Sequence, residues 1–243
     1  EVQGQLSALT PEMLRLIDEK SAIFRAAAGK LATAGHGTAT TTAEPVPDAH
    51  WDFEIDGRDR IGNLHLRPNP AATVTDGSLR FDGDNGHARS ELIPESIGEF
   101  SVEIWAELEL DDTKGLKLFR LGTKDSHNAL SFNGNGAGKW DYQWRRKRRQ
   151  QAVRTLPPSS GLSQYVLTVG PDAIHVYFNG TNSMFRDGSA RIQNSFLSFD
   201  EGAAHIRLGH YNFNHPGTLK GRIAEARFFP RVLSPDEIVS LHR

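Results

Sequence analysis

Apolar and polar residues alternate in short segments along most of the chain after residue 51. The even-numbered positions of residues 100–108 are apolar, and they alternate with Ser101, Glu103, Trp105 and Glu107. A period of two is typical of a β-strand with one buried face. The same pattern predicts strands at residues 78–81, 116–121, 129–132, 139–149, 165–169, 174–178, 205–208 and 222–229. Turn residues recur about every ten residues, and this spacing predicts an all-β antiparallel sandwich.

Two short motifs predict where the chain turns and where its last helix begins. Asn179 and Gly180 follow an apolar strand segment, and both residues tolerate the positive φ of a tight hairpin turn. Ser234 and Glu237 have the spacing of a capping box, in which each side chain bonds the backbone amide of the other residue. We therefore expect a short closing helix that buries Ile238 and Leu241.

The first 49 residues follow a different pattern from the rest of the chain. Thr10 and Pro11 favour a helix start, and apolar residues recur at helical spacing up to about residue 32. Residues 33–49 are rich in Thr, Ala and Gly, as a linker is. We expect two parts: an amphipathic helix with its linker at residues 1–49, and a β-sandwich at residues 50–243. The apolar helix face predicts docking on the sandwich or on neighbouring sequence, with membrane-surface binding as the alternative.

Composition and charge exclude several classes of function. The formal net charge is -2, which removes a general electrostatic argument for nucleic acid as a partner. No apolar run has the length of a membrane span. The chain contains no cysteine, so disulfides, thiolate metal sites and a cysteine nucleophile are excluded.

The order of these segments resembles the laminin G-like jelly rolls of the concanavalin A-like lectin and glucanase superfamily. The resemblance covers about residues 51–243 and rests on WDFE at 51–54, GSLRFDG at 77–83, EFSVEIWAEL at 99–108, IHVYFNG at 174–180, IRLG at 206–209 and GRIAEARFFPRVLSPDEI at 221–238. It implies an antiparallel sandwich but no particular activity, because lectins, adhesion modules, glycosidases and lyases share this fold.

A narrower resemblance concerns the run GRDRIGNLHLRPNPAATVTDGSLRF at residues 57–81. It is similar to the module inserted in large cytochrome-domain surface proteins of planctomycetes, where a helical segment and a loose linker precede the module. This resemblance implies an exported protein, in the periplasm or at the cell surface. The haem-binding cysteines of such proteins are absent here.

Acidic residues on one strand face are the candidate catalytic groups of an enzyme. Glu103 and Glu107 would lie about 13 Å apart, beyond the separation of about 5 to 9.5 Å that paired glycosidase carboxylates need. Glu107 and Glu109 have an allowed spacing of about 7 Å, but they end a strand beside a polar turn, where solvated acids are common. Glu103 and Trp105 remain candidate ligand contacts.

The run Arg89-Ser90-Glu91-Leu92 is similar to one piece of an alginate lyase family, in which arginine neutralises a uronate. The Gln-x-His and Tyr-Phe-Lys elements of that family are missing from this sequence. We interpret Arg89 and Glu91 as an ion pair on one face of a strand edge.

An aromatic strand that leads into a basic run is the leading candidate binding site. Trp140, Tyr142 and Trp144 share one strand face, and residues 145–149, which include Arg145, Arg146 and Arg148, follow directly. Aromatic faces stack on sugar rings and guanidinium groups bind carboxylates or sulfates, so the site could bind an anionic carbohydrate. The alternatives are that the aromatic residues belong to the core, and that the cations only block edge-to-edge aggregation.

Calcium is the one cofactor for which the sequence offers a candidate site. Laminin G-like domains often hold Ca²⁺ with oxygen ligands, and Asp82, Asp84 and Asn85 in the run FDGDNG would supply them. A plain acidic turn is the alternative.

The sequence favours a non-catalytic binding or spacer module that recognises a carbohydrate or a partner domain. The alternative is a polysaccharide-degrading glycosidase or lyase of the same superfamily, using Glu103, Glu107 or Arg89. A structure separates the two, because an enzyme requires these side chains to converge.

Replacing Arg146 and Arg148 with serine tests the basic run. If the run binds anionic glycans, the double variant should elute from a sulfated-glycan column at a lower salt concentration than the wild-type chain, because two charge-assisted contacts are lost. Identical elution of the two proteins would show that the run does not bind.

Overall fold

The computed structural model describes residues 44–83, 85–109, 116–123, 129–134, 139–144, 149–154, 161–171, 174–182, 199–209 and 219–242. The predicted helix at residues 11–32 lies outside the described residues, as do residues 33–43 of the predicted linker and residues 145–148 of the basic run. Ala49, at the end of the predicted linker, already belongs to the first strand. The antiparallel β-sandwich predicted from the alternation is confirmed.

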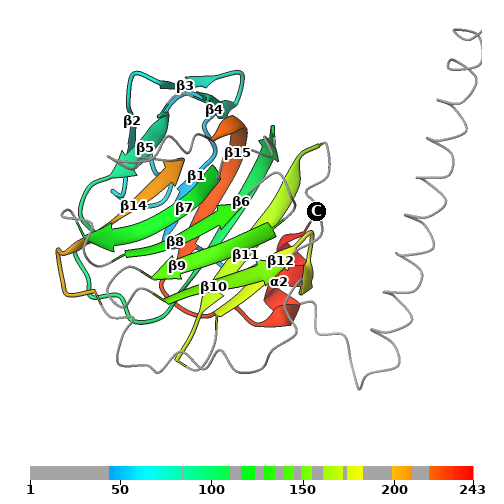
Figure 1. Cartoon of the computed structure of the whole chain (residues 1–243). Coiled ribbons are helices and arrows are strands. Elements are labelled where there is room, and N and C mark those ends of the chain that lie inside the picture. The colour runs from blue at the N-terminus through cyan, green and yellow to red at the C-terminus, as the bar shows by residue number, and fades with distance from the viewer. Residues whose placement is uncertain are drawn as a thin grey trace, which may run out of the picture. The chain divides into compact units, whose positions relative to one another are not determined.

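Two antiparallel sheets, which we call sheet A and sheet B, form the sandwich (Figure 1). Sheet A has eight strands in the order β13-β12-β11-β6-β15-β4-β3, with β1 also paired to β15. Sheet B has seven strands in the order β10-β9-β8-β7-β14-β5-β2. Sheet A contains β1 (Ala49–Trp51), β3 (Ala72–Thr75), β4 (Ser78–Asp82), β6 (Phe100–Leu108), β11 (Ser163–Val169), β12 (Ile174–Phe178), β13 (Thr181–Asn182) and β15 (Lys220–Phe229). Sheet B contains β2 (Leu66–Pro68), β5 (His87–Ser90), β7 (Leu116–Thr123), β8 (Ala129–Gly134), β9 (Lys139–Trp144), β10 (Arg149–Arg154) and β14 (Ala204–Gly209).

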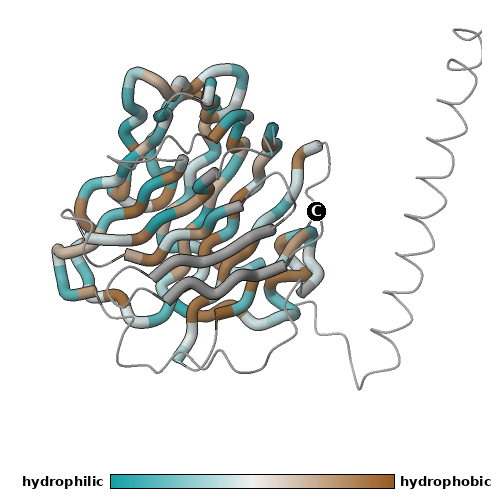
Figure 2. Tube along the Cα trace, in the orientation of Figure 1, coloured by the Kyte–Doolittle hydropathy of each residue, from teal (hydrophilic) through white to brown (hydrophobic). Residues whose placement is uncertain are grey.

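The core lies between the inner faces of the two sheets. Phe100 on β6 is fully buried and contacts Phe119 on β7 and Phe228 on β15, with ring centroids 6.1 and 5.8 Å apart. Hydrophobic and hydrophilic residues alternate along the strands, as Figure 2 shows. Along the strands whose side chains are described, most apolar side chains therefore face the core, while Val166, Tyr177 and Phe229 belong to a second, smaller apolar cluster.

The predicted turn and the predicted start of the last helix are both confirmed. Asn179 and Gly180 connect β12 to β13, with φ angles of 48° and 71°. The helix α2 (Pro235–Leu241) begins with a complete capping box between Ser234 and Glu237. Ile238 and Leu241 on α2 pack with residues of β11, β12 and β15, so the helix covers part of the outer face of sheet A.

One strand prediction was wrong in its extent. Residues 139–149 were expected to form a single strand, but the chain reverses after β9, and Arg149 on β10 pairs with Trp144. Alternation identifies residues that fit a strand, whereas a turn without Gly, Pro or Asn leaves no break in that pattern.

The segment between β1 and β2 is held by one buried carboxylate. Asp59, which is 7% exposed, accepts hydrogen bonds from the backbone amides of His50, Ile61 and Leu64 at 3.0, 3.0 and 3.1 Å. The Trp51 indole, fully buried in the core, donates to the Leu64 carbonyl at 2.9 Å. These hydrogen bonds connect the segment between β1 and β2 to β1 itself and to the buried Trp51.

Replacing Asp59 with alanine should lower the free energy of unfolding by at least about 3 kcal/mol, because three backbone amides lose a charged acceptor. Urea unfolding followed by circular dichroism measures this change. Asp236→Ala, at an exposed position in the first turn of α2, is the control and should change stability by less than about 1 kcal/mol. Equal stability of the two variants would contradict the role of Asp59.

Candidate functional site

The outer face of sheet A carries a buried carboxylate, Glu103, in the middle of β6. Glu103 is fully buried, and its Oε1 accepts hydrogen bonds from Gln164 Nε2 at 2.7 Å and Trp105 Nε1 at 2.9 Å. Arg227 lies 3.6 Å from the other carboxylate oxygen. Burial raises the pKa of Glu103, while the bond from Gln164 and the charge of Arg227 oppose that effect. The Glu103 carboxylate thus already interacts with three side chains of the protein itself.

Arg227 connects Glu103 to a longer network of charges. Its guanidinium contacts Glu44 at 2.6 Å and Glu225 at 2.6 Å, and it is itself only 6% exposed. His50 Nε2 donates to Glu225 at 2.8 Å. This bond lowers the pKa of Glu225 to about 2, with further help from the Arg227 charge. Alternating charges of this kind compensate one another, so the network stabilises the outer face of sheet A.

Trp105 is also engaged in a contact within the sandwich. Its ring is stacked on His242, which directly follows α2, with centroids 5.7 Å apart and planes 5° from parallel. One face of the indole is therefore covered. Sequence reasoning offered Trp105 and Glu103 as ligand contacts, and that role stays a prediction.

The other acids of this face are held by separate cations. Glu107 pairs with Arg222 at 2.8 Å, and the exposed Glu109 pairs with Lys220. A cavity of about 410 Å³ lies beside them and is lined in part by Arg80, Asp82 and Thr73. Glu103, Glu107 and Glu109 each have their own partners and form no shared carboxylate pair in the described contacts.

The three aromatic residues of the predicted binding strand lie on β9 in sheet B. The pairing of β9 with β8 places Tyr142 opposite Phe132 and Trp144 opposite Leu130, both of which are core residues. The side chains of Trp140, Tyr142 and Trp144 lie outside the described part of the structure, as do Arg145, Arg146 and Arg148, so a binding role for all six stays a prediction.

The candidate calcium ligands lie at the turn between β4 and β5. Asp82 ends β4 and is exposed, and Asn85 follows with a φ of 58°. The Asn85 backbone carbonyl accepts a hydrogen bond from Asn69 Nδ2 at 3.1 Å. Asp84 lies outside the described residues. Within the described ranges, no group of three or more His, Cys, Asp or Glu side chains could hold a metal ion. A calcium site at this turn stays a prediction.

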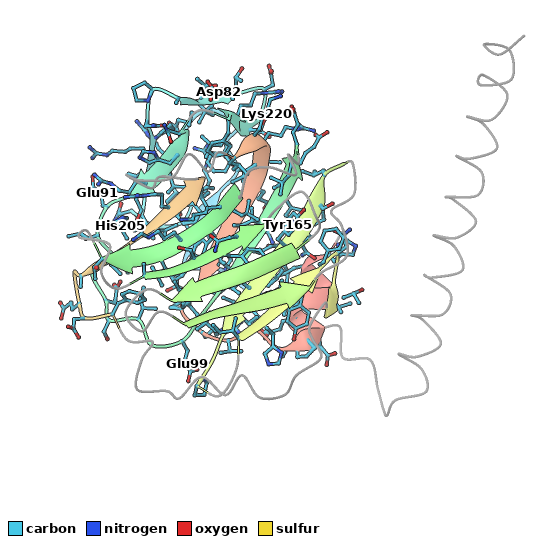
Figure 3. All side chains as sticks on the ribbon, in the orientation of Figure 1. Asp82, Glu91, Glu99, Tyr165, His205 and Lys220 are labelled. Atoms are coloured by element: carbon cyan, nitrogen blue, oxygen red, sulfur yellow. The ribbon has the colours of Figure 1, made fainter. Side chains whose placement is uncertain are left out.

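The outer face of sheet B carries polar side chains that are shielded from solvent. Five of them are only 4 to 8% exposed: Arg120, Ser131, Asn133, His205 and Arg207. They belong to the neighbouring strands β7, β8 and β14, and His205 is labelled on β14 in Figure 3. An outer sheet face normally exposes such side chains to water. This face is therefore a sheltered polar surface.

Sequence reasoning did not identify this surface, although a signal for it exists. Arg120 stands between Phe119 and Leu121, and Arg207 stands between Ile206 and Leu208, so both arginines must leave the core. Their nearness to each other depends on the pairing of β7 with β14, which no local pattern reveals.

The ion pair expected between Arg89 and Glu91 is replaced by another. Glu91 forms its ion pair with Arg67 on the neighbouring strand β2. The side chain of Arg89 on β5 is exposed on the same face as Arg67, which it directly opposes. The expectation was wrong because cross-strand partners compete with neighbours along the chain.

No helix within the described ranges has the length and apolar character needed to cross a membrane.

Comparison with known proteins relates this chain to one superfamily and its fold to several solved structures. Residues 81–239 match the family described as the concanavalin A-like lectin/glucanases superfamily. Domain 4 of the extracellular GH43 arabinanase AbnA from Geobacillus stearothermophilus, solved with arabinotriose, is similar with a TM-score of 0.62 and 21% identity, over 82% of this chain and 100% of that domain. No curated protein sequence matches the chain significantly.

Two larger proteins contain the same fold in part. Trypanosoma rangeli sialidase, solved with sialic acid, is similar with a TM-score of 0.63 and 17% identity, over 86% of this chain and 34% of the sialidase. The binding domain of botulinum neurotoxin serotype G has a TM-score of 0.59 and 11% identity, over 81% of this chain and 50% of that chain. The chain thus spans a third to a half of these two proteins, and at such identities the likeness shows the fold.

The charge network on sheet A should make stability depend on pH. The pKa of Glu225 in the folded protein is about 2, below its ordinary 4.5, so the ionised group stabilises the fold above pH 4.5. That contribution is lost as the pH falls towards about 2. We expect Glu225→Gln to remove part of the loss of stability over this range, as measured by urea unfolding at successive pH values.

Glu99→Gln is the matched control for this experiment, because Glu99 is exposed just before β6 (Figure 3). Its stability should follow the wild-type dependence on pH. If the wild-type and Glu225→Gln curves run parallel from pH 4.5 downward, Glu225 does not contribute as described.

Proposed function

The chain belongs to the concanavalin A-like lectin/glucanase superfamily, and from that premise we propose that it is a non-catalytic carbohydrate-binding module. The proposed binding surface is the outer face of sheet B. The observation that carries the proposal is the set of shielded polar side chains on that face, centred on Arg120, Asn133 and Arg207.

The chemistry of this face suits a sugar. Saccharides present many hydroxyl groups, which exchange hydrogen bonds with amides, hydroxyls and charged side chains. Ser131 and Asn133 supply acceptors and donors on β8, and Arg120 lies directly opposite Ser131 on β7. Shielding from water strengthens such bonds, because fewer solvent molecules compete for the same groups.

The alternative of a polysaccharide-degrading enzyme has less support. A glycosidase needs one carboxyl group to donate a proton and another to act as base or nucleophile. Glu103 is buried, with its Oε1 accepting hydrogen bonds from Gln164 and Trp105, and Glu107 is paired with Arg222. A binding module needs no such free pair.

The similarity to the arabinanase domain supports a carbohydrate ligand, because that domain was solved with arabinotriose. The alternative ligand, a partner domain, is supported only by the range of functions that proteins of this fold have. Export to the periplasm or cell surface, and a relation to the planctomycete surface proteins, rest on the resemblance of residues 57–81 and are part of the proposal.

A glycan array with the whole chain tests the proposal, together with an assay for reducing sugar released from the glycans that bind. We expect binding without release of sugar above the buffer background. Asn133→Ala should weaken binding to the best glycan by about tenfold, because it removes an amide from the shielded face.

Asn63→Ala is the control for Asn133→Ala, because Asn63 is exposed outside sheet B. It should leave binding unchanged, and thermal melting should show that both variants fold. Release of sugar by the wild-type chain would overturn the non-catalytic proposal. If no glycan on the array binds, the proposed carbohydrate-binding function is wrong.

A further inference from the structure

Four neighbouring strands at one side of sheet B carry arginine at directly opposed positions. Arg67 on β2 lies opposite Arg89 on β5, Arg89 lies opposite Arg207 on β14, and Arg207 lies opposite Arg120 on β7. Directly opposed residues share one sheet face, with Cβ atoms about 4.5 to 5.5 Å apart. We call these four residues the arginine row.

The arginine row gathers four positively charged side chains on one sheet face. Guanidinium groups remain charged at any physiological pH, and like charges directly opposite each other destabilise a sheet. Ser131 on β8, which directly opposes Arg120, is a neutral polar neighbour of the row. The four arginines thus lie side by side on one half of the face, next to the polar residues of β8.

The four arginines differ in their surroundings. Arg67, at the sheet edge, is paired with Glu91. Arg207 and Arg120 are 6% and 8% exposed. Arg89 lies between the edge and the buried pair, is exposed, and forms no ion pair with any residue in the part of the chain that the structure describes. It is the cation of the row that is open to an incoming anion.

The positive charge of the arginine row helps to lower the pKa of two histidines, His205 and His87. Arg207 donates to His205 Nε2 at 3.2 Å, and because a guanidinium cannot accept, Nε2 must be the acceptor and the imidazole is neutral. Burial and the charges of Arg207, Arg89 and Arg120 lower the pKa of His205 to about 4. Burial, Arg207 and Arg89 also lower the pKa of His87. A bound anion would offset this potential.

We infer that the arginine row binds the acidic group of an anionic saccharide, either a uronate carboxylate or a sugar sulfate. Planar guanidinium forks match both groups through paired hydrogen bonds. Arg89 makes the direct contact, and the buried Arg207 beside it adds charge. Ser131 and Asn133 on β8 then meet the sugar hydroxyls. This inference rests on the proposed function and specifies its ligand class.

The test compares polysaccharides that differ only in charge. Binding of the whole chain to polygalacturonate and to its methyl ester, and to dextran sulfate and to dextran, is measured by affinity electrophoresis. We expect the charged member of at least one pair to bind more tightly. Arg89→Gln should weaken that binding by about tenfold, since it removes a charge-assisted contact.

Arg80→Gln is the matched control, because Arg80 is a strand arginine on β4 of sheet A and makes the same change in net charge. It should alter binding by less than about twofold. Arg89→Lys keeps the charge but loses the planar guanidinium. Its affinity for the charged polysaccharide should lie between those of the wild type and Arg89→Gln. In nuclear magnetic resonance titrations, galacturonate or sulfate should raise the pKa of His205 in the wild type but not in Arg89→Gln.

Each outcome separates this inference from the proposed function. Equal binding of charged and uncharged polymers, or unchanged binding by Arg89→Gln, would overturn the inference and leave the module a carbohydrate binder. Absence of binding to all four polymers and to the array would overturn the proposed function as well. If a single-stranded oligonucleotide binds as tightly and loses affinity in Arg89→Gln, the row is a nucleic-acid site and the saccharide assignment is wrong.

Discussion

The packing of the two inner sheet faces around Phe100, Phe119 and Phe228 is the interaction on which the rest of the structure depends. A strand alternates its side chains with a period of two, so burying one set forces the other set outward. With Val102 and Ile104 on β6 in the core, Glu103 and Trp105 must lie on the outer face of sheet A. The core thus determines which chemistry each outer face can present.

The two outer faces use their polar residues differently. On sheet A, Arg227 pairs with Glu44 and His50 with Glu225, while α2 covers apolar residues of the same face. A buried ion is tolerated only with such compensation. On sheet B, the described ion pair of the arginine row lies at the edge, between Arg67 and Glu91. The exposed Arg89 of that row is the reason why sheet B is the better candidate for binding an external ligand.

Much of the fold could be predicted from local patterns, because those patterns act over a few residues. The alternation in β6, the Asn179-Gly180 turn and the capping box at Ser234 each depend on neighbours in sequence, and the structure confirms all three. The break between β9 and β10 was missed because its residues carry no turn signal. The Arg89–Glu91 ion pair was wrong because Arg67 of another strand is the partner.

The sequence by itself determined most of the long strands, their inward and outward sets, and the superfamily. Only the tertiary structure decided which strands are neighbours and in which register, because backbone hydrogen bonds are the same for every strand and do not depend on side-chain identity. Arg67, Arg89, Arg120 and Arg207 are far apart along the chain and unremarkable one at a time. They become one surface because β2, β5, β14 and β7 pair in that order.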